Sequence, residues 1–163
     1  MKQTWKAGDI FLIPNADGLF TPGQVIAHEK RTLHSASCAF FDQRVASREE
    51  ARTIKLDPAK CVSALLVTPD SLDEGLWVIV GNQSVVLPKK LWPYEEMLSR
   101  KQKNGPMVRG SGNVVAFLDA FHRLRPWDSW FRADYLDEYL LTPDKKPKNV
   151  ILVKSSPNKH TDG

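Results

Sequence analysis

Short apolar runs separated by turn residues dominate the first 90 positions of the chain. The runs with the length and composition of a β-strand are residues 10–13, 24–27, 37–41, 61–67, 76–80 and 84–87. Gly18 and Gly23 lie between the first two runs among Asn, Asp and Pro residues, which predicts a hairpin. The run at residues 61–67 is almost continuously apolar, which predicts burial on both faces and a central place in the sheet. We therefore expect a strongly bent antiparallel sheet or a small barrel of about six strands.

The apolar spacing changes to a helical period at Asn113. The apolar residues that share one helical face from there are Val114, Phe117, Leu118, Phe121 and Leu124. Asn113 is suited to cap the free amides at the start of this helix. Pro126 disfavours helical backbone in the residue before it, so the helix ends by Arg125. The pattern predicts one helix with a single buried face.

Residues 127–153 are expected to close the fold. Trp127, Trp130 and Phe131 follow Pro126, and aromatic residues directly after a helix-ending proline more often fill the core than bind a partner. Asp134 is placed to cap a short second helix, and the β-branched residues 150–153 predict a final strand. The expected fold class is α+β, mainly β, with the C-terminal helix, the short second helix and the final strand packed on the sheet.

Three polar segments connect these elements. Residues 44–60 predict an exposed loop with one helical turn, because Ser47 and Glu50 have the spacing of a capping box. Residues 69–74 predict one or two helical turns that end before Gly75. Residues 95–101 predict a partial helix within a surface segment that is broken by Pro and Gly.

Length and composition bound the class of protein. The chain has 163 residues, of which 42% are hydrophobic, and this is enough for one core. We expect a single domain over residues 1–154 and a flexible tail at 155–163. Cys38 and Cys61 lie in apolar runs, which favours buried thiols in a reducing compartment over a disulfide. No apolar run has the length of a signal peptide or a membrane span, so we expect a cytoplasmic protein without membrane contact.

The ionisable residues give little indication of catalysis. The four histidines are interpreted as surface residues, with His122 on the solvent-facing side of the predicted helix. The acids at 128–138 have ordinary roles as helix caps and dipole partners, and the glycine that a calcium loop uses is missing. We therefore expect no enzymatic activity, no metal and no cofactor.

A second hypothesis concerns residues 89–103, where Lys and Arg are interleaved with Trp92 and Tyr94. Such a patch on a small bent sheet is able to neutralise phosphates and to stack bases. The alternative is that the aromatic side chains pack in the core and the lysines form a solvated face. The formal net charge of +4 permits an anionic partner without requiring one. Nucleic acid is therefore the less favoured partner.

Three stretches together resemble one protein family. They are KAGDIFLIPNADGLFTPGQVI at residues 6–26, TPDSLDEGLWVIVG at 68–81, and FLDAFHRLRPWDSWFRADYLDEYLLTPDKKPKN at 117–149. In this order they resemble the immunity protein 26 family of bacterial polymorphic toxin systems. The resemblance implies a mainly β fold, no catalytic residues, and a function in binding and neutralising a toxin that is encoded nearby.

The toxin-binding surface is expected in the closing stretch. Inhibitory proteins bind through buried aromatic anchors inside a polar rim, with complementary charge setting the association rate. The acidic concentration in this stretch is suited to face a basic cleft on the toxin. The residues expected to bind are Trp127 or Trp130 as the anchor, with Asp128, Asp134, Asp137 and Glu138 around it.

Overall fold

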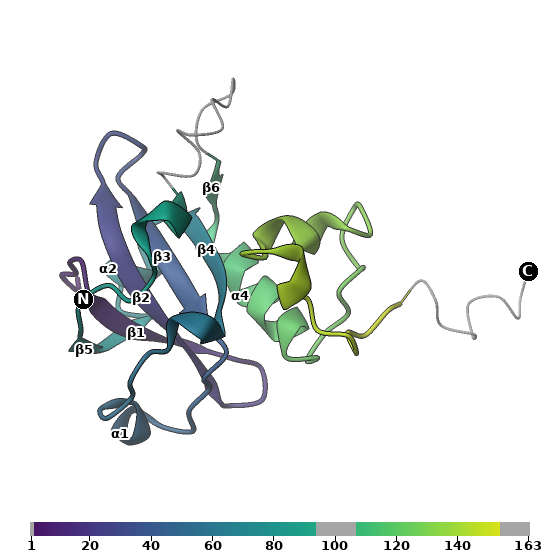
Figure 1. Ribbon diagram of the computed structural model, residues 1–163, viewed down its shortest axis with the longest axis horizontal. Helices are drawn as coiled ribbons and strands as arrows, with labels where there is room; N and C mark the ends of the chain where they lie inside the picture. The colour runs from purple at the N-terminus through teal and green to yellow at the C-terminus, as the bar shows by residue number, and fades with distance from the viewer. Residues whose placement is uncertain (1, 94–106, 154–163) are drawn as a thin grey trace, which may run out of the picture.

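The computed structural model describes residues 2–93 and 107–153, and its main element is one six-stranded sheet (Figure 1). The strands are β1 (Asp9–Pro14), β2 (Phe20–Glu29), β3 (Ser35–Phe41), β4 (Cys61–Val67), β5 (Val78–Asn82) and β6 (Val108–Arg109). Their order in the sheet is β5-β1-β2-β3-β4-β6. Neighbouring strands are antiparallel except for β4 and β6, which are parallel. The structure confirms the α+β, mainly β class, with a mixed rather than a purely antiparallel sheet.

The predicted hairpin is present as β1 and β2, which pair from Ile10 with Gln24 to Pro14 with Phe20. Gly18 adopts a φ of +87° in the connecting turn, a conformation that glycine tolerates best. Gly23 has a different role, because a Cβ there would lie 2.5 Å from the Phe11 ring. The hairpin thus depends on glycine for its turn and for the close packing of one core ring.

Short helices connect and cover the strands. They are the α-helices α1 (Arg48–Ala51), α2 (Asp70–Asp73) and α4 (Ser111–Phe121), and the 3-10 helices η1 (Pro58–Lys60), η2 (Lys89–Leu91), η3 (Tyr135–Tyr139) and η4 (Pro143–Lys145). The helical turns expected near residues 48 and 70 are confirmed, and the Ser47 hydroxyl accepts the Glu50 amide as the capping pattern predicts. The partial helix expected at 95–101 lies outside the described residues.

The main helix begins and ends earlier than its apolar spacing predicts. Its first amide, that of Ser111, donates to the Thr68 hydroxyl at 2.9 Å, so the start is fixed by a distant side chain rather than by Asn113. At the other end Arg123 adopts a φ of +62°, and the Leu124 amide returns to the Asp119 carbonyl at 2.8 Å. This helix-ending arrangement stops α4 at Phe121, four residues before the limit set by Pro126.

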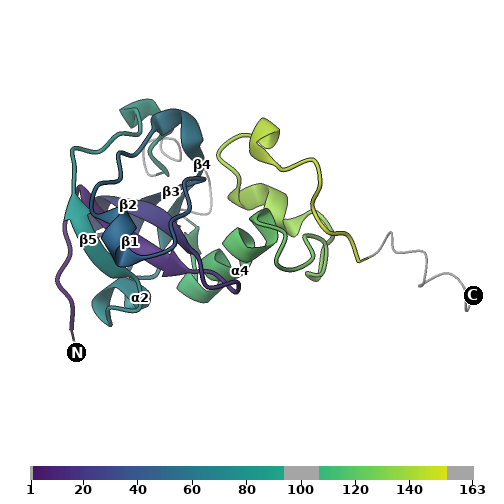
Figure 2. The ribbon, with the colours of Figure 1, turned by 90° about the horizontal axis from the view of Figure 1, so that it is seen from below.

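The sheet is covered on both faces. All seven residues of β3 are buried, so β3 rather than β4 is the centre of the sheet. The largest apolar cluster joins strand residues such as Phe40 to α4, where Val114, Phe117 and Leu118 are fully buried. Figures 1 and 2 both show α4 between the sheet and the C-terminal residues 122–153. A second cluster on other sheet positions includes Leu56 and Leu87, which belong to connecting segments.

Two predicted strands are wrong. Residues 84–87 form no strand, and the Val86 amide donates to the side chain of the buried Gln24 at 3.1 Å instead of to a neighbouring strand. Residues 150–153 lie against the C-terminal loops, where the Ile151 carbonyl accepts the Trp127 amide at 2.8 Å. Strand β6 was not predicted, because it has only two residues and follows a polar segment.

Both cysteines are free and buried, as predicted. Burial raises the pKa of Cys38 far above its usual range and that of Cys61 to about 11. Among the helices of residues 2–93 and 107–153, none has the length and apolarity needed to cross a membrane.

Candidate functional site

The short helix η3 is held firmly against the body of the protein. The Tyr139 ring is fully buried and stacks on Phe117 of α4, with 5.3 Å between ring centroids. The Tyr139 carbonyl accepts the Ser63 hydroxyl of β4 at 2.5 Å, and the Leu141 amide donates to the Val62 carbonyl at 2.8 Å. Side chains that project from η3 therefore start from a rigid base.

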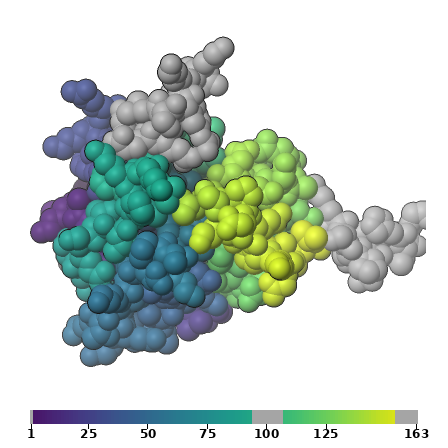
Figure 3. Space-filling model, viewed as in Figure 1, coloured from purple at the N-terminus to yellow at the C-terminus, as the bar shows by residue number. Residues whose placement is uncertain are grey.

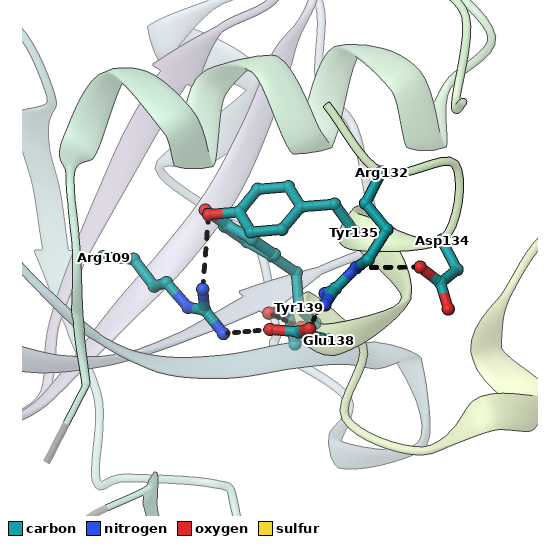
Figure 4. Close-up of polar contacts among 7 residues, drawn as sticks. Arg109, Arg132, Asp134, Tyr135, Glu138 and Tyr139 are labelled. Carbon is teal, nitrogen blue, oxygen red and sulfur yellow. Dashed lines mark hydrogen bonds and ion pairs between the residues drawn. The ribbon is translucent and has the colours of Figure 1, made fainter. Parts of the chain in front are cut away.

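Arg109 of β6 forms the inner half of a polar network around η3 (Figure 4). Its guanidinium lies 4.5 Å from the centroid of the Tyr139 ring and donates to the Tyr135 hydroxyl at 3.3 Å. A second nitrogen of the same group pairs with the Glu138 carboxylate at 3.3 Å. The Arg109 side chain is only 11% exposed, so these contacts are shielded from water.

Arg132 forms the outer half of the network (Figure 4). Its Nε pairs with Asp134 at 2.9 Å, and its Nη2 pairs with the Glu138 carboxylate. Glu138 thus joins the two arginines, one on each side. The Arg132 side chain is 48% exposed, so its ion pairs face the solvent and contribute less to stability than those of Arg109.

Aromatic rings lie next to this network at the protein surface. Phe131 is 81% exposed, and its ring centroid lies 5.1 Å from that of Tyr135. Trp130 contacts the same Tyr135 ring at 5.1 Å, and the Arg125 guanidinium lies 5.8 Å from the Trp130 centroid. Arg132 lies 5.7 Å from the Phe131 centroid. We call the residues Trp130, Phe131, Arg132 and Tyr135 the Phe131 surface.

Two predicted binding residues have structural roles instead. Trp127 is 1% exposed; its indole nitrogen donates to Asp137 at 2.7 Å, and the Lys146 ammonium lies 5.4 Å from its ring centroid. Asp128 is 5% exposed, and its carboxylate accepts the Val153 amide at 2.8 Å. Side chains so deeply buried offer almost no area to a partner, so Trp127 is not the anchor and Asp128 is not part of the rim.

The remaining predicted binding residues lie near the Phe131 surface. Trp130 belongs to it, and Asp134, Asp137 and Glu138 are exposed. Each of these acids is paired with a basic side chain: Asp134 with Arg132, Asp137 with Lys146, and Glu138 with both arginines of the network. This corrects the expectation of an acidic concentration, since neighbouring cations from three segments neutralise it.

Four members of this site were not assigned to binding from the sequence. Phe131 and Arg132 are neighbours of the predicted residues in the sequence. An apolar residue such as Phe131 among charged residues could have indicated an exposed binding side chain. Tyr135 was interpreted only as an apolar contact of the short helix. Arg109 gave no signal, because it lies in a polar stretch and the fold alone brings it to Glu138, 29 residues away.

Burial changes the ionisation of two groups near α4. Burial raises the pKa of Tyr139 to about 12, and the hydrogen bond with the Tyr135 hydroxyl at 3.0 Å acts in the same direction. His122 was expected to face the solvent but is half-buried, and burial lowers its pKa to about 4. Within the residues that the structure describes, its Nε2 has no hydrogen-bond partner.

The alternative basic patch lies mostly outside the described residues. Lys89 and Lys90 are exposed on η2, but Trp92 is half-buried and its indole nitrogen donates to the Leu87 carbonyl at 2.8 Å. Positions 94–103 of the patch are not described, so nucleic-acid binding there stays a prediction. Residues 2–93 and 107–153 contain no group of three or more His, Cys, Asp or Glu side chains placed to hold a metal ion.

Comparison of the chain with models of protein families, with curated proteins and with solved structures found no match in any of the three. The resemblance to the immunity protein 26 family therefore stays a prediction from the three sequence stretches, and the Phe131 surface is described from its own geometry.

Proposed function

We propose that this protein is a cytoplasmic immunity protein that binds a cognate bacterial toxin through the Phe131 surface and blocks the toxin's active site or an adjacent surface. The single observation that carries this proposal is the exposure of Phe131, at 81%, on a base of fixed aromatic rings. Burial of a phenylalanine side chain at an interface stabilises a complex by about 1.5–3 kcal/mol. The ring is therefore suited to act as an anchor.

The composition of the surface supports a protein partner. Trp, Tyr and Arg are the residue types most enriched among side chains that dominate binding energy, and all three surround Phe131. Asp134 and Glu138 supply polar groups at the edge, with side chains 70% and 41% exposed. An apolar centre with a polar border is typical of a specific protein interface.

The rigidity of η3 supports the same function. Ordering a side chain on binding costs about 0.5–1.5 kcal/mol. Contacts with Tyr135 and Arg132 already restrict Phe131, and Tyr139 fixes the helix beneath it. Little of the binding free energy would then be lost in ordering the surface.

The paired acids determine how binding would depend on salt. Asp134, Asp137 and Glu138 already have basic partners within the chain, so they exert little long-range attraction on a basic toxin. Affinity is then expected to come from apolar and short-range contacts and to fall only weakly as ionic strength rises.

The test is a co-expression experiment. The reading frame beside this gene is cloned under an inducible promoter, and growth is scored with and without this protein. Rescue of growth together with co-purification of the two proteins is the expected result. A neighbour that is toxic but not rescued, or that is harmless, would contradict the proposed function for this pair.

A further inference from the structure

The tip of the hairpin between β2 and β3 holds two consecutive non-glycine residues in left-handed backbone. Leu33 has a φ of 54° and His34 a φ of 53°. The Ser35 amide donates to the Thr32 carbonyl at 2.9 Å and closes a two-residue turn around them. Turns of this type favour Asn and Gly, because the Cβ of other residues crowds the neighbouring carbonyl. Leucine and histidine are thus costly residues at these two positions.

Two other turns meet the same backbone requirement with glycine, whereas Arg123 meets it at the end of α4 with a φ of +62°. Gly18 has a φ of +87° in the turn between β1 and β2, and Gly75 has a φ of +76° after α2. Packing does not explain the choice at the tip, since Leu33 is 80% exposed. A strained backbone that holds an exposed apolar side chain is typical of a binding segment.

Aromatic side chains support one side of this tip. His34 lies 5.8 Å from His28, and His28 lies 4.6 Å from Trp5, measured between ring centroids. Trp5 is fixed in turn, because its indole nitrogen donates to Asp73 at 2.7 Å. These rings border an open hollow of about 380 Å³, lined by Gln3, Thr4, Trp5, His28, His34, Pro69 and Asp73. Three aromatic side chains in contact with one another therefore support one side of the tip.

The charge that the tip offers to a partner is positive. Lys30 and Arg31 are exposed beside Leu33. The neighbouring acid, Glu29, accepts the Ser37 hydroxyl at 2.5 Å and keeps its charge, so two cations stand against one carboxylate. A partner that fits this tip therefore has an apolar recess for Leu33 and acidic side chains around it.

We propose that the hairpin tip is a second contact with the toxin, in which Leu33 enters an apolar recess bordered by acidic side chains. This inference rests on the proposed function, because the occupant is the same toxin, but it assigns a different surface. Figure 1 places the tip at the far end of the sheet from η3, and Figure 3 shows it projecting from the body of the protein. A toxin that touches both surfaces would extend across the sheet.

A protein fits the tip better than the other anionic partners do. A single leucine buries too little apolar area to hold a chain at a membrane, which takes a whole amphipathic face. Single-stranded nucleic acid binds by stacking bases on flat rings, a mode that would leave the exposed Leu33 side chain unused.

The test uses the purified product of the neighbouring reading frame as the probe. Leu33→Asn removes the apolar side chain and keeps the turn, since Asn tolerates left-handed backbone, so a higher urea midpoint is expected. The dissociation constant is expected to rise at least tenfold. Leu76→Asn is the matched control, because Leu76 is a 63% exposed leucine elsewhere, and its dissociation constant should equal that of the wild type.

Two further variants sharpen the result. His34→Gly keeps Leu33 but removes one supporting ring and frees the backbone of the tip, so weaker binding is expected; binding equal to that of the wild type would contradict a preorganised tip. Lys30→Glu should lower the association rate constant at low salt, and an unchanged rate constant would contradict an acidic border.

The outcomes separate this inference from the proposed function. If the wild type binds and Leu33→Asn binds equally well, the second contact is wrong and the proposed function stands. If the wild type does not bind the probe at all, both are wrong. Leu33-dependent binding of anionic lipid vesicles or of single-stranded DNA without toxin would overturn the assignment of a protein occupant.

Discussion

The guanidinium of Arg109 lies 4.5 Å from the centroid of the Tyr139 ring and joins the shortest strand of the sheet to the helix that supports Phe131. The same guanidinium pairs with Glu138, so one side chain from β6 makes both a cation-π contact and an ion pair with η3. Because β6 has only two residues, this contact links the sheet edge to the C-terminal segment through a side chain rather than through an extended ladder.

Arg109 is expected to contribute more to stability than Arg132, although both arginines pair with Glu138. Shielded cation-π and ion-pair contacts are worth about 1–2 kcal/mol, whereas exposed ion pairs are worth about 0–1 kcal/mol. Arg109→Met should therefore lower the free energy of unfolding by about 1–2 kcal/mol, and Arg132→Met by less than about 0.5 kcal/mol. Urea unfolding of the two variants measures this difference. Equal losses would contradict the separation of the network into an inner and an outer half.

Truncation of Trp127 is expected to lower the free energy of unfolding far more than truncation of Phe131. Trp127→Ala removes a fully buried ring and should lower the free energy of unfolding by about 3–5 kcal/mol. Phe131→Ala removes an exposed ring and should change it by no more than about 0.5 kcal/mol. Thermal and urea unfolding provide the measurement. A large loss of stability for Phe131→Ala would show that the ring supports the fold and is not free to bind.

Charge reversal is expected to lower the free energy of unfolding much more at the buried Asp128 than at the exposed Asp134. Asp128→Lys places an unpaired cation in a site where the carboxylate accepts the Val153 amide, so a loss of about 3–5 kcal/mol is expected. Asp134→Lys affects a 70% exposed side chain and should cost no more than about 1 kcal/mol. Circular dichroism during urea unfolding reports both values. The account fails here if Asp128→Lys is as stable as the wild type.

His122 is expected to make stability depend on pH in the acidic range. Burial, with Arg44 as the next cause, lowers the folded-state pKa to about 4, while the unfolded pKa is near 6.5. Between these values the unfolded chain binds the proton and the folded chain does not, so stability falls as pH decreases from about 6.5 to 4. Because His122 is partly exposed, its protonation is expected to lower the free energy of unfolding by only about 1–2 kcal/mol over this range.

His122→Gln removes this titration, and the difference in unfolding free energy between the variant and the wild type isolates it from that of the carboxylates. The difference should shift in favour of the variant as pH falls through the window. A difference that stays constant from pH 6.5 to 4 would show that His122 titrates normally in the folded protein.

The elements that are determined by local sequence patterns were predictable from the sequence. Strands β1 to β4 each contain one of the predicted apolar runs because their side chains face a core, although β2 extends well beyond its run at residues 24–27. The Ser47 cap follows from four consecutive residues. The burial of Cys38 likewise follows from the apolar strand that contains it.

The errors arose where distant side chains decide the structure. Gln24 takes up the Val86 amide and keeps residues 84–87 out of the sheet, and Thr68 sets the first turn of α4. The sequence was enough to predict where the candidate site lies, but not which residues form it. Nothing local to residues 127–138 indicates that Arg109 would neutralise Glu138 or that Trp127 would lie inward while Phe131 lies outward.

The most direct test of the proposed function is the dissociation constant of the complex with the neighbouring toxin, measured for the wild type and for Phe131→Ala by isothermal titration calorimetry. If Phe131 is the anchor, its loss should weaken binding at least tenfold, equivalent to about 1.4 kcal/mol, with an unchanged urea midpoint. Leu76→Ala, an exposed leucine outside the Phe131 surface, should bind like the wild type. An unchanged dissociation constant for Phe131→Ala would contradict binding through this surface.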